Sequence, residues 1–444
     1  MTEPEALPGL RAGVVVVGAG PAGLAAAGSA AAAGQDVLLL DAAPLAGGQV
    51  WRARQGVPSV PVARALAHLA QAGGRVLAGT RVVMPLPGQA LLVDGPQGAR
   101  RVRWERLVLA TGARERLLPL PGWTLPGVFG AGGLQALVKG GWPIRGRRVL
   151  VAGSGPLLLA AAATLRREGA DVVGIAEESG GRALAGFAGA LAAHPGKGWQ
   201  ALRLGLFLAG TRFLAGWRVH AIEGDDRVRQ VVLENASGRR RGIACEALAA
   251  SWGLVPQTGL AQALGCPPGQ RFGAAAIEVD AQQRTGIAGL WAVGECTGVA
   301  GARAAWLQGE IAGRSVAAAA AGADAASHRH ARALRRELAF AATVARAFPA
   351  PADWASRLRD DTLVCRCEDV AWAALRHQPD LRAAKLSTRC GMGHCQGSLC
   401  HDTLATVMRW PRLPSRPPLA PVPLATLLAA DAGQAPSLHQ EPPP

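Results

Sequence analysis

The fold is decided by the stretch VVVVGAGPAGLAAAGSAAAAGQDVLLLD, which occupies residues 14–41 of the 444-residue chain. The four consecutive valines at residues 14–17 predict a buried strand. The alanine-rich run from Pro21 to Gly34 predicts a helix, and the run from Val37 to Leu40 predicts a second strand. The stretch is therefore a strand–helix–strand unit with a glycine-rich turn, which indicates an α/β protein.

Three glycines mark the turn between the first strand and the helix. Gly18 permits the tight turn, Gly20 lets the backbone approach a pyrophosphate, and Gly23 lets the helix lie close to the strand. The helix N-terminus then offers free N–H donors to the phosphates. Asp41 ends the second strand, where a carboxylate can accept hydrogen bonds from ribose hydroxyls. The pattern predicts a dinucleotide site, because a glycine-rich turn without a ligand leaves Asp41 unexplained.

The same pattern recurs from Arg147 to Ala176, where residues 153–158 read GSGPLL. Leu158 stands where a third glycine or alanine is expected, and we expect its bulk to push the helix from the strand and disturb the pocket. Glu177 lies at the end of the next strand and would favour NADH over a 2′-phosphorylated cofactor. NADH is therefore a doubtful cofactor, and a structural relic or a site for another nucleotide remain alternatives.

Other elements are expected from local patterns. They are strands at Arg106–Ala110 and Gly289–Val293, helices at Ala302–Ala321 and Arg329–Ala347, two helices within Gly181–Trp217 broken at Pro195–Gly198, a helix that Glu368 and Asp369 cap and that runs through Arg376, and an extended proline-rich segment at Pro411–Pro444.

Composition excludes several classes of protein. The net charge is +16, but only three of the 47 basic residues are lysine, the arginines are scattered, and there is no tyrosine, so we expect no nucleic acid partner. The apolar run from Val149 to Leu165 is too short and too interrupted to be a transmembrane segment. The acidic start, with Glu3 and Glu5, does not resemble a secretion signal. A cytoplasmic, thiol-preserving location is expected.

The eight cysteines are unevenly distributed. Cys245, Cys266 and Cys296 are isolated and are expected to be small buried residues. The other five lie within 36 residues, which indicates a metal site rather than disulfides; they are Cys365, Cys367, Cys390, Cys395 and Cys400. The C-x-C and C-x4-C spacings favour a 2Fe-2S cluster, with structural zinc or unliganded thiols as alternatives and Cys390 as an unassigned fifth cysteine.

Two later phrases resemble the signatures of flavoproteins that have paired dinucleotide-binding domains. They contain Thr111 and Gly112 in Ala110-Thr111-Gly112, and Gly294 and Glu295 in Ala292-Val293-Gly294-Glu295, where the second signature normally has Asp. Gly48 and Gln49 resemble the flavin-adjacent loop of that group. The resemblance implies FAD and a discontinuous FAD domain with a second Rossmann-like domain inserted. No paired cysteines stand where thioredoxin reductase-like or glutathione reductase-like enzymes carry them, so dithiol chemistry is not expected.

The cysteine segment resembles the bacterioferritin-associated-ferredoxin-like 2Fe-2S domain that is appended to several flavoprotein subunits. The phrases concerned are Cys365-Arg366-Cys367-Glu368 and residues 388–400, TRCGMGHCQGSLC. In that pattern the ligands correspond to Cys365, Cys367, Cys395 and Cys400, and the position of Cys390 is variable. The resemblance therefore implies a small C-terminal helical iron-sulfur domain.

Longer phrases are similar to a group that comprises the A or alpha subunits of opine oxidases, D-hydroxyproline and L-proline dehydrogenases and the B subunit of hydrogen cyanide synthase. They lie at residues 110–116, 121–128, 153–159 and 416–424. The implied architecture is α/β, of the pyridine nucleotide-disulfide oxidoreductase type. Its expected parts are an FAD-binding domain at 1–120 and 251–322, the inserted domain at 121–250, a helical linker at 323–360, the 2Fe-2S domain at 361–411 and a proline-rich tail at 412–444.

The resemblance implies an electron-transfer flavoprotein subunit of a heteromeric amino-acid or opine dehydrogenase. A second flavoprotein subunit would oxidise the amine, and this subunit would pass electrons through FAD and a 2Fe-2S cluster to an acceptor such as a quinone or the respiratory chain. Partners could hold it at the inner face of the membrane. No acid–base pair for amine oxidation is evident in the sequence. The alternatives are a self-sufficient NADH-dependent reductase of a ferredoxin or small acceptor, and a zinc-stabilised assembly subunit.

Overall fold

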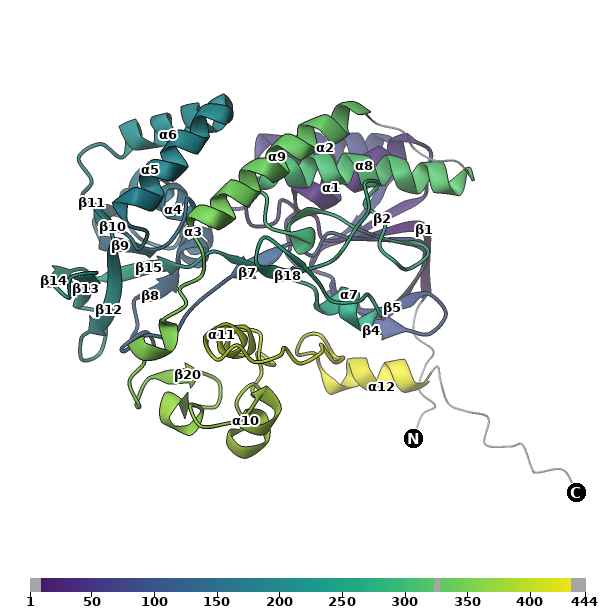
Figure 1. The fold of residues 1–444 in the computed structure, drawn as a ribbon. Helices are drawn as coiled ribbons and strands as arrows, with labels where there is room; N and C mark the ends of the chain where they lie inside the picture. The colour runs from purple at the N-terminus through teal and green to yellow at the C-terminus, as the bar shows by residue number, and fades with distance from the viewer. Residues whose placement is uncertain (1–8, 323–327, 433–444) are drawn as a thin grey trace, which may run out of the picture.

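The computed structural model describes residues 9–322 and 328–432. Two nucleotide-binding domains lie side by side, and the segment that contains the clustered cysteines lies against both of them (Figure 1). Two antiparallel strands connect the domains, β7 (Ala113–Glu115) and β16 (Leu254–Pro256). The expectations about the N-terminus, the first part of the linker and the end of the tail concern residues 1–8, 323–327 and 433–444, which lie outside the described residues.

The first domain is built on a seven-stranded sheet of order β3-β2-β1-β6-β5-β4, in which β19 also pairs with β6. The predicted unit is present as β1 (Gly9–Val17), α1 (Pro21–Ala32) and β2 (Val37–Leu40). β1 pairs in parallel with both β2 and β6, and this central place explains its run of valines. The remaining elements are α2 (Val60–Gln71), β3 (Arg75–Leu77), β4 (Arg81–Leu86), β5 (Ala90–Gly95), β6 (Gly98–Leu109) and β19 (Leu290–Ala292).

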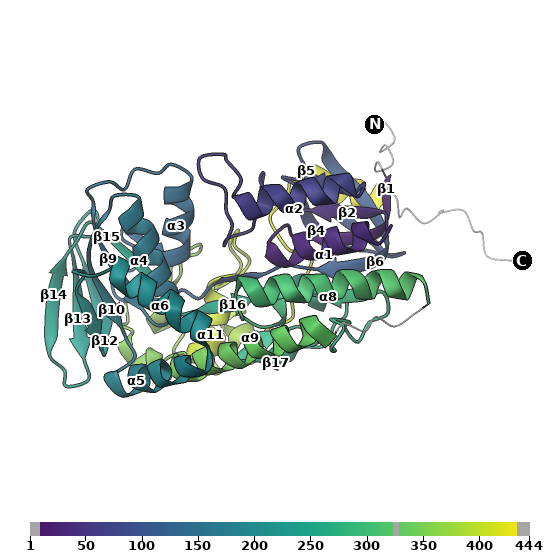
Figure 2. The same ribbon diagram turned by 90° about the horizontal axis from the view of Figure 1, so that it is seen from above.

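The long helix α8 (Ala302–Ala320) packs closely along α1 (Figure 2). A Cβ added at Gly309 or at Gly313 would overlap a backbone carbonyl oxygen of α1. Glycine at these two positions therefore lets the backbones of α1 and α8 approach closely. The close contact fixes α8 beside the first glycine-rich turn.

The second domain has a five-stranded parallel sheet of order β11-β10-β9-β15-β8, whose strands lie between β6 and β19 in the sequence. The predicted helical pair is present as α5 (Gly181–Ala190) and α6 (Pro195–Phe207), but the break is a 3-10 turn at Leu191–Ala193, and residues 195–198 form the first turn of α6. The other elements are β8 (Val128–Gly130), α3 (Ala131–Lys139), β9 (Arg148–Gly153), α4 (Leu157–Arg167), β10 (Asp171–Glu177), β11 (Phe213–Ala215), β15 (Ala247–Ser251) and the antiparallel strands β12 (Trp217–Glu223), β13 (Gln230–Asn235) and β14 (Arg240–Ala244).

The remainder of the chain returns across both domains. The helix α9 (His328–Ala347) packs against α8 and α5 and leads into the cysteine segment. The elements of that segment are β20 (Leu363–Cys365), β21 (Val370–Ala371), α10 (Leu381–Thr388) and α11 (Cys400–Val407), and they share one small apolar core. Three small elements complete the first domain: α7 (Gly259–Ala263), β17 (Gly269–Arg271) and β18 (Ala274–Ala276).

Two local expectations are wrong. The helix predicted through Arg376 is replaced by β21 and a single 3-10 turn at Trp372–Ala374. Asp369 has a φ of 48°, a left-handed conformation that turns the chain back to pair with β20 instead of starting a helix. The segment predicted to be extended from Pro411 contains the helix α12 (Leu424–Ala432), which covers an apolar cluster beside β4 and β5.

Candidate functional site

The three glycines of the first turn occupy different surroundings. Gly18 has a φ of 106° and Gly23 lies so close to Gly18 that an added Cβ would overlap its carbonyl oxygen. The nearest atom to a Cβ at Gly20, by contrast, would be the Cα of Gly48, 3.9 Å away. Gly20 supplies no side-chain cap to α1, so N–H groups of the first helical turn remain to bind a phosphate. These features fit a pyrophosphate at the turn.

Asp41 holds the turn in place as well as facing it. Its carboxylate accepts hydrogen bonds from the backbone N–H of Ala19 and, at 2.7 Å, from that of Ala43. The side chain is therefore fixed at the end of β2, next to the position where the pattern predicts a ribose.

The other residues that the flavoprotein resemblance indicates lie around the same turn. Gly47 donates its N–H to the carbonyl of Ala19 and so holds the Gly48-Gln49 loop against the turn. The Thr111 hydroxyl donates to the carbonyl of Gln257 at 2.7 Å. The N–H of Gly294 donates to the Gln308 side chain, and burial raises the pKa of the neighbouring carboxyl of Glu295, which the Gly301 N–H partly offsets.

A single cavity of about 2590 Å³ joins these residues. Gly23 does not line it, because α1 packs there against the strand. The cavity continues from the first turn to the cysteine segment, where Cys395 and His401 line it. The predicted residues that line it are Gly18, Gly20, Asp41, Gly48, Gln49, Thr111, Gly112, Gly294 and Glu295.

Glu115 also lines the cavity, and the sequence-based reasoning did not identify it. Its carboxylate accepts hydrogen bonds from the N–H groups of Gly132 and Gly133 at the start of α3, at 2.7 and 2.9 Å. Burial raises the pKa of Glu115, and these two N–H groups oppose that shift. A Cβ at Gly130 would overlap the carboxylate. The cluster of glycines around α3 is the signal that could have indicated a buried partner.

The second glycine-rich turn is arranged differently. The buried Glu177 carboxylate accepts hydrogen bonds from the Gly155 N–H at 2.9 Å and from the Ser154 hydroxyl at 3.0 Å. Glu177 is thus held at its turn by a backbone N–H, as Asp41 is held by the Ala19 N–H at the first turn. Leu158 is 1% exposed and packs in the core of the second domain.

The end of α9 and the residue that follows it contact this second turn. A Cβ at Gly155 would lie 3.9 Å from the side chain of Phe348, and the Ser179 hydroxyl donates to the carbonyl of Ala347. The Phe348 ring also contacts Phe187 of α5, with centroids 5.1 Å apart. Gly153, Gly155 and Glu177 are all described, and none of them lines the cavity. Phe348, and not the hydrogen bond of Glu177, therefore distinguishes this turn from the first one.

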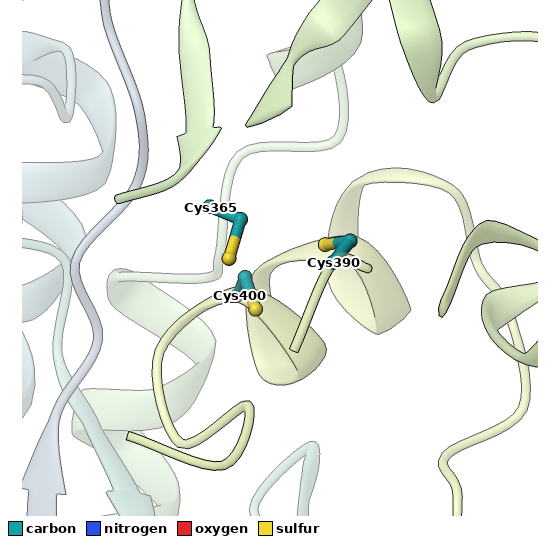
Figure 3. Close-up of side chains that lie close together, drawn as sticks. All are labelled: Cys365, Cys390 and Cys400. Atoms are coloured by element: carbon teal, nitrogen blue, oxygen red, sulfur yellow. The ribbon is translucent and has the colours of Figure 1, made fainter. Parts of the chain in front are cut away.

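The cysteine segment brings three sulfurs together. The Sγ atoms of Cys365, Cys390 and Cys400 all lie within 4.8 Å of one another, and all three side chains are buried (Figure 3). They come from the end of β20, the turn after α10 and the start of α11. The Gly391 N–H points at the Cys365 sulfur at 3.5 Å. Cys390, which the resemblance left outside the ligand set, is therefore central to this group.

The other two cysteines form a pair beside this group. Burial raises the pKa of the Cys367 thiol, and its hydrogen bond to Cys395 adds to that shift. Burial acts in the same direction on Cys395, but hydrogen bonds from Cys367 and from the Gly397 N–H prevail and lower the pKa of Cys395. The hydrogen bond with Cys390 and burial both raise the pKa of Cys400. A metal that binds thiolates would relieve this crowding, so the residues fit a thiolate-bound metal group.

His401 is another residue that the sequence-based reasoning missed. Its imidazole fills the space left by Gly391 and Gly397, where an added Cβ would overlap the ring. The ring lines the cavity together with Gly391 and Gly397. The two glycines are thus explained by the packing of one side chain.

The isolated cysteines are buried, as predicted, at 3% exposure for Cys245, 6% for Cys266 and 0% for Cys296. Burial raises the pKa of Cys245 and of Cys296 to about 11. Burial therefore favours the protonated form of these two thiols, which is less nucleophilic than the thiolate.

The fold and the site together define a flavin-dependent oxidoreductase with two dinucleotide-binding domains, and the comparisons agree. Residues 12–321 match the family described as pyridine nucleotide-disulphide oxidoreductase. The chain belongs to this family.

Curated relatives are similar over nearly the whole chain. The A subunit of opine oxidase from Rhizobium meliloti strain 1021 is 33% identical, with 92% of this chain and 97% of that protein covered. Hydrogen cyanide synthase subunit HcnB of Pseudomonas aeruginosa is 35% identical, with 87% and 90% covered. Both relatives are named as subunits, and the predicted family resemblance is confirmed.

Solved structures show the same fold. L-proline dehydrogenase from P. horikoshii superposes with a TM-score of 0.69 at 19% identity, with 95% of this chain and 80% of that chain covered. Thioredoxin reductase from Lactococcus lactis has a TM-score of 0.51 at 21% identity, with 69% of this chain and 97% of that chain covered. Among the described residues, every helix is too short or too polar to cross a membrane.

Proposed function

We propose that the protein is the electron-transfer subunit of a heteromeric amino-acid or opine dehydrogenase. The observation that carries this proposal is the cavity itself, because one continuous space reaches from the first glycine-rich turn to Cys395. When bound, FAD would supply two-electron redox chemistry and a 2Fe-2S cluster would supply one-electron transfer.

FAD would be held by the first turn, with Gly20 at the pyrophosphate and Asp41 at the ribose. The rest of the FAD molecule would be enclosed by Thr111, Gly112 and the Gly48-Gln49 loop. Gly294 and Glu295, which precede α8, would line the cavity on the other side. Asp41 is oriented by Ala19 and Ala43 before any ligand binds, which reduces the entropy lost on binding.

The cluster would be held by Cys365, Cys367, Cys395 and Cys400. Cys395 is in hydrogen-bond contact with Cys367 and lines the cavity, so both thiols lie where the matched pattern places ligands. Cys390 would be a buried neighbour of the cluster. Structural zinc is the competing assignment, and metal analysis of anaerobically purified protein separates the two.

The partner would be a second flavoprotein subunit that oxidises the amine. The relatives' names as subunits of opine oxidase and of hydrogen cyanide synthase support this assignment. The acceptor would be a quinone or another member of a respiratory chain. The complex would work in the cytoplasm, at the inner face of the membrane.

A self-sufficient NADH-dependent reductase is the second candidate function. Phe348 lies against Gly155, and neither Gly155 nor Glu177 lines the cavity, whereas Gly20 and Asp41 of the first turn do. These contacts favour the electron-transfer subunit over this candidate.

The test uses the whole chain, reduced anaerobically with dithionite and mixed with a water-soluble quinone analogue. Reoxidation of flavin is followed at its visible absorbance, and reoxidation of the cluster by electron paramagnetic resonance. Cys395→Ala should retain FAD but slow flavin reoxidation at least tenfold. Cys266→Ala, buried elsewhere, should behave as wild type. Equal rates in Cys395→Ala and wild type would overturn the proposed electron path.

A further inference from the structure

The helix α6 presents an apolar face to solvent. Trp199, Leu202 and Leu206 are 62%, 52% and 67% exposed. Their spacing of three and four residues places them on one side of the helix, and Leu208, just past its end, is buried against the domain. All twelve tryptophans lie in the described residues, and of these only Trp199 is exposed. Apolar groups of this size are not normally gathered on a solvated helix face.

Positive charge borders this face. Arg203 shares it, and Arg212 is exposed just beyond the C-terminal end of α6. The guanidinium groups of Arg166 and Arg167, on α4, lie over the ring of the partly exposed Phe207, at 5.6 and 4.9 Å from its centroid. There is no Asp or Glu between residues 181 and 217. The surface therefore combines a tryptophan, leucines and a phenylalanine with charge of one sign.

The position of α6 restricts what can cover the face. The helix lies at the outer edge of the second domain, away from α12 (Figure 1). A symmetric contact with a second copy would bring Arg203 and its neighbours against the same cations, with no acid in the segment to pair with them. An anionic bilayer complements both properties, because its headgroups attract arginine and its interface takes up tryptophan and leucine.

We propose that the exposed face of α6, with its arginine border, docks on an anionic phospholipid bilayer. The docking deepens the proposed function, because a lipid-soluble acceptor such as a quinone would then be delivered at the surface where the subunit lies. The binding itself depends on α6 and not on the redox groups.

The first test is cosedimentation of the full chain with vesicles of phosphatidylglycerol and phosphatidylcholine, compared with vesicles of phosphatidylcholine alone. Wild type should bind the anionic vesicles, and added salt should weaken the binding. Leu206→Ser should lower the partition coefficient about tenfold, the value expected for losing one buried leucine. Leu424→Ser is the matched control, since Leu424 is 69% exposed on α12 and should leave binding unchanged.

The second test places the helix in the lipid. Brominated acyl chains should quench part of the tryptophan fluorescence of wild type, and Trp199→Phe should remove that quenching while retaining vesicle binding. Failure of wild type to bind anionic vesicles, or equal binding by Leu206→Ser, would overturn the docking proposal. The docking proposal would also be overturned if Leu206→Ser lost binding to the partner subunit but bound vesicles as wild type does. The exposed face of α6 would then be a protein interface. Electron transfer to the water-soluble quinone analogue should be unchanged in Leu206→Ser, so the two proposals fail separately.

Discussion

At the scale of single residues, Gly20 and Gly23 serve different purposes although both belong to one motif. The chain itself leaves room for a side chain at Gly20, whereas a side chain at Gly23 would overlap the backbone. We therefore expect Gly20→Val to fold and to purify without FAD, because the valine would occupy the place of the pyrophosphate. Visible flavin absorbance and far-ultraviolet circular dichroism measure the two properties.

Two further variants bracket this result. Gly186→Val lies in open space on α5 and should retain full flavin. Gly23→Ala should lose both flavin and stability, because α1 must move away from Gly18. Full flavin content in Gly20→Val would contradict the assignment of the turn.

The five thiols of the cysteine segment allow a second prediction at this scale. Cys395→Ala should lose most of the iron, because it removes one of the four sulfurs that the matched pattern assigns to the cluster. Cys390→Ala should retain the cluster, because four sulfurs suffice for two irons and the resemblance leaves this position variable. Iron content and the electron paramagnetic resonance signal after dithionite reduction measure the outcome.

The opposite pattern has a clear meaning. Loss of iron in Cys390→Ala but not in Cys395→Ala would make the buried group of Cys365, Cys390 and Cys400 the core of the ligand set. Zinc in place of iron in wild type would remove the electron-relay mechanism.

At the scale of elements, the end of α9 determines what the second domain can bind. NADH should reduce the flavin very slowly, because Phe348 covers the turn at Gly155. Phe348→Ala should accelerate reduction, because it removes the side chain that lies against Gly155. Stopped-flow absorbance measures both rates. Rapid bleaching of wild type by NADH would favour the reductase instead.

The elements that the sequence predicts are those with local signals. β1, α1 and β2 are specified by a valine run, an alanine run and three glycines within 28 residues, and they form as expected. The helix expected through Arg376 fails because Asp369 adopts a left-handed conformation to pair β21 with β20. A capping motif alone does not reveal that tertiary pairing.

The same distinction applies to the candidate site. Gly18, Gly20 and Asp41 are predictable because one turn supplies all three. Glu115 and Phe348 are not, because their partners at Gly132 and Gly155 are brought to them only by the arrangement of the domains. Spacing identifies five candidate thiols but not which sulfurs approach one another.

At the scale of the whole molecule, one buried charge joins the cysteine segment to the chain that connects the two dinucleotide-binding domains. Asp402 of α11 is 3% exposed and pairs with Arg116, which follows β7, at 3.6 Å, and with Arg412. The Thr403 hydroxyl adds a hydrogen bond to the carbonyl of Leu117 at 3.0 Å. These contacts join α11 to the chain that passes between the two nucleotide domains.

Asp402→Ala should therefore loosen the cysteine segment as a unit. Removing the carboxylate leaves the largely buried Arg116 without its partner, and breaking such a pair costs about 3–5 kcal/mol. We expect the visible absorbance of the cluster to be lost at a lower temperature than in wild type, and proteolysis to begin within residues 349–412 while the flavin remains bound. Asp360→Ala is the control, because its pair with Arg376 is exposed and should contribute less than about 1 kcal/mol. If the two variants lost the cluster at the same temperature, apolar packing alone would hold the segment in place. That packing includes the edge-on contact between the rings of Trp354 and Trp252.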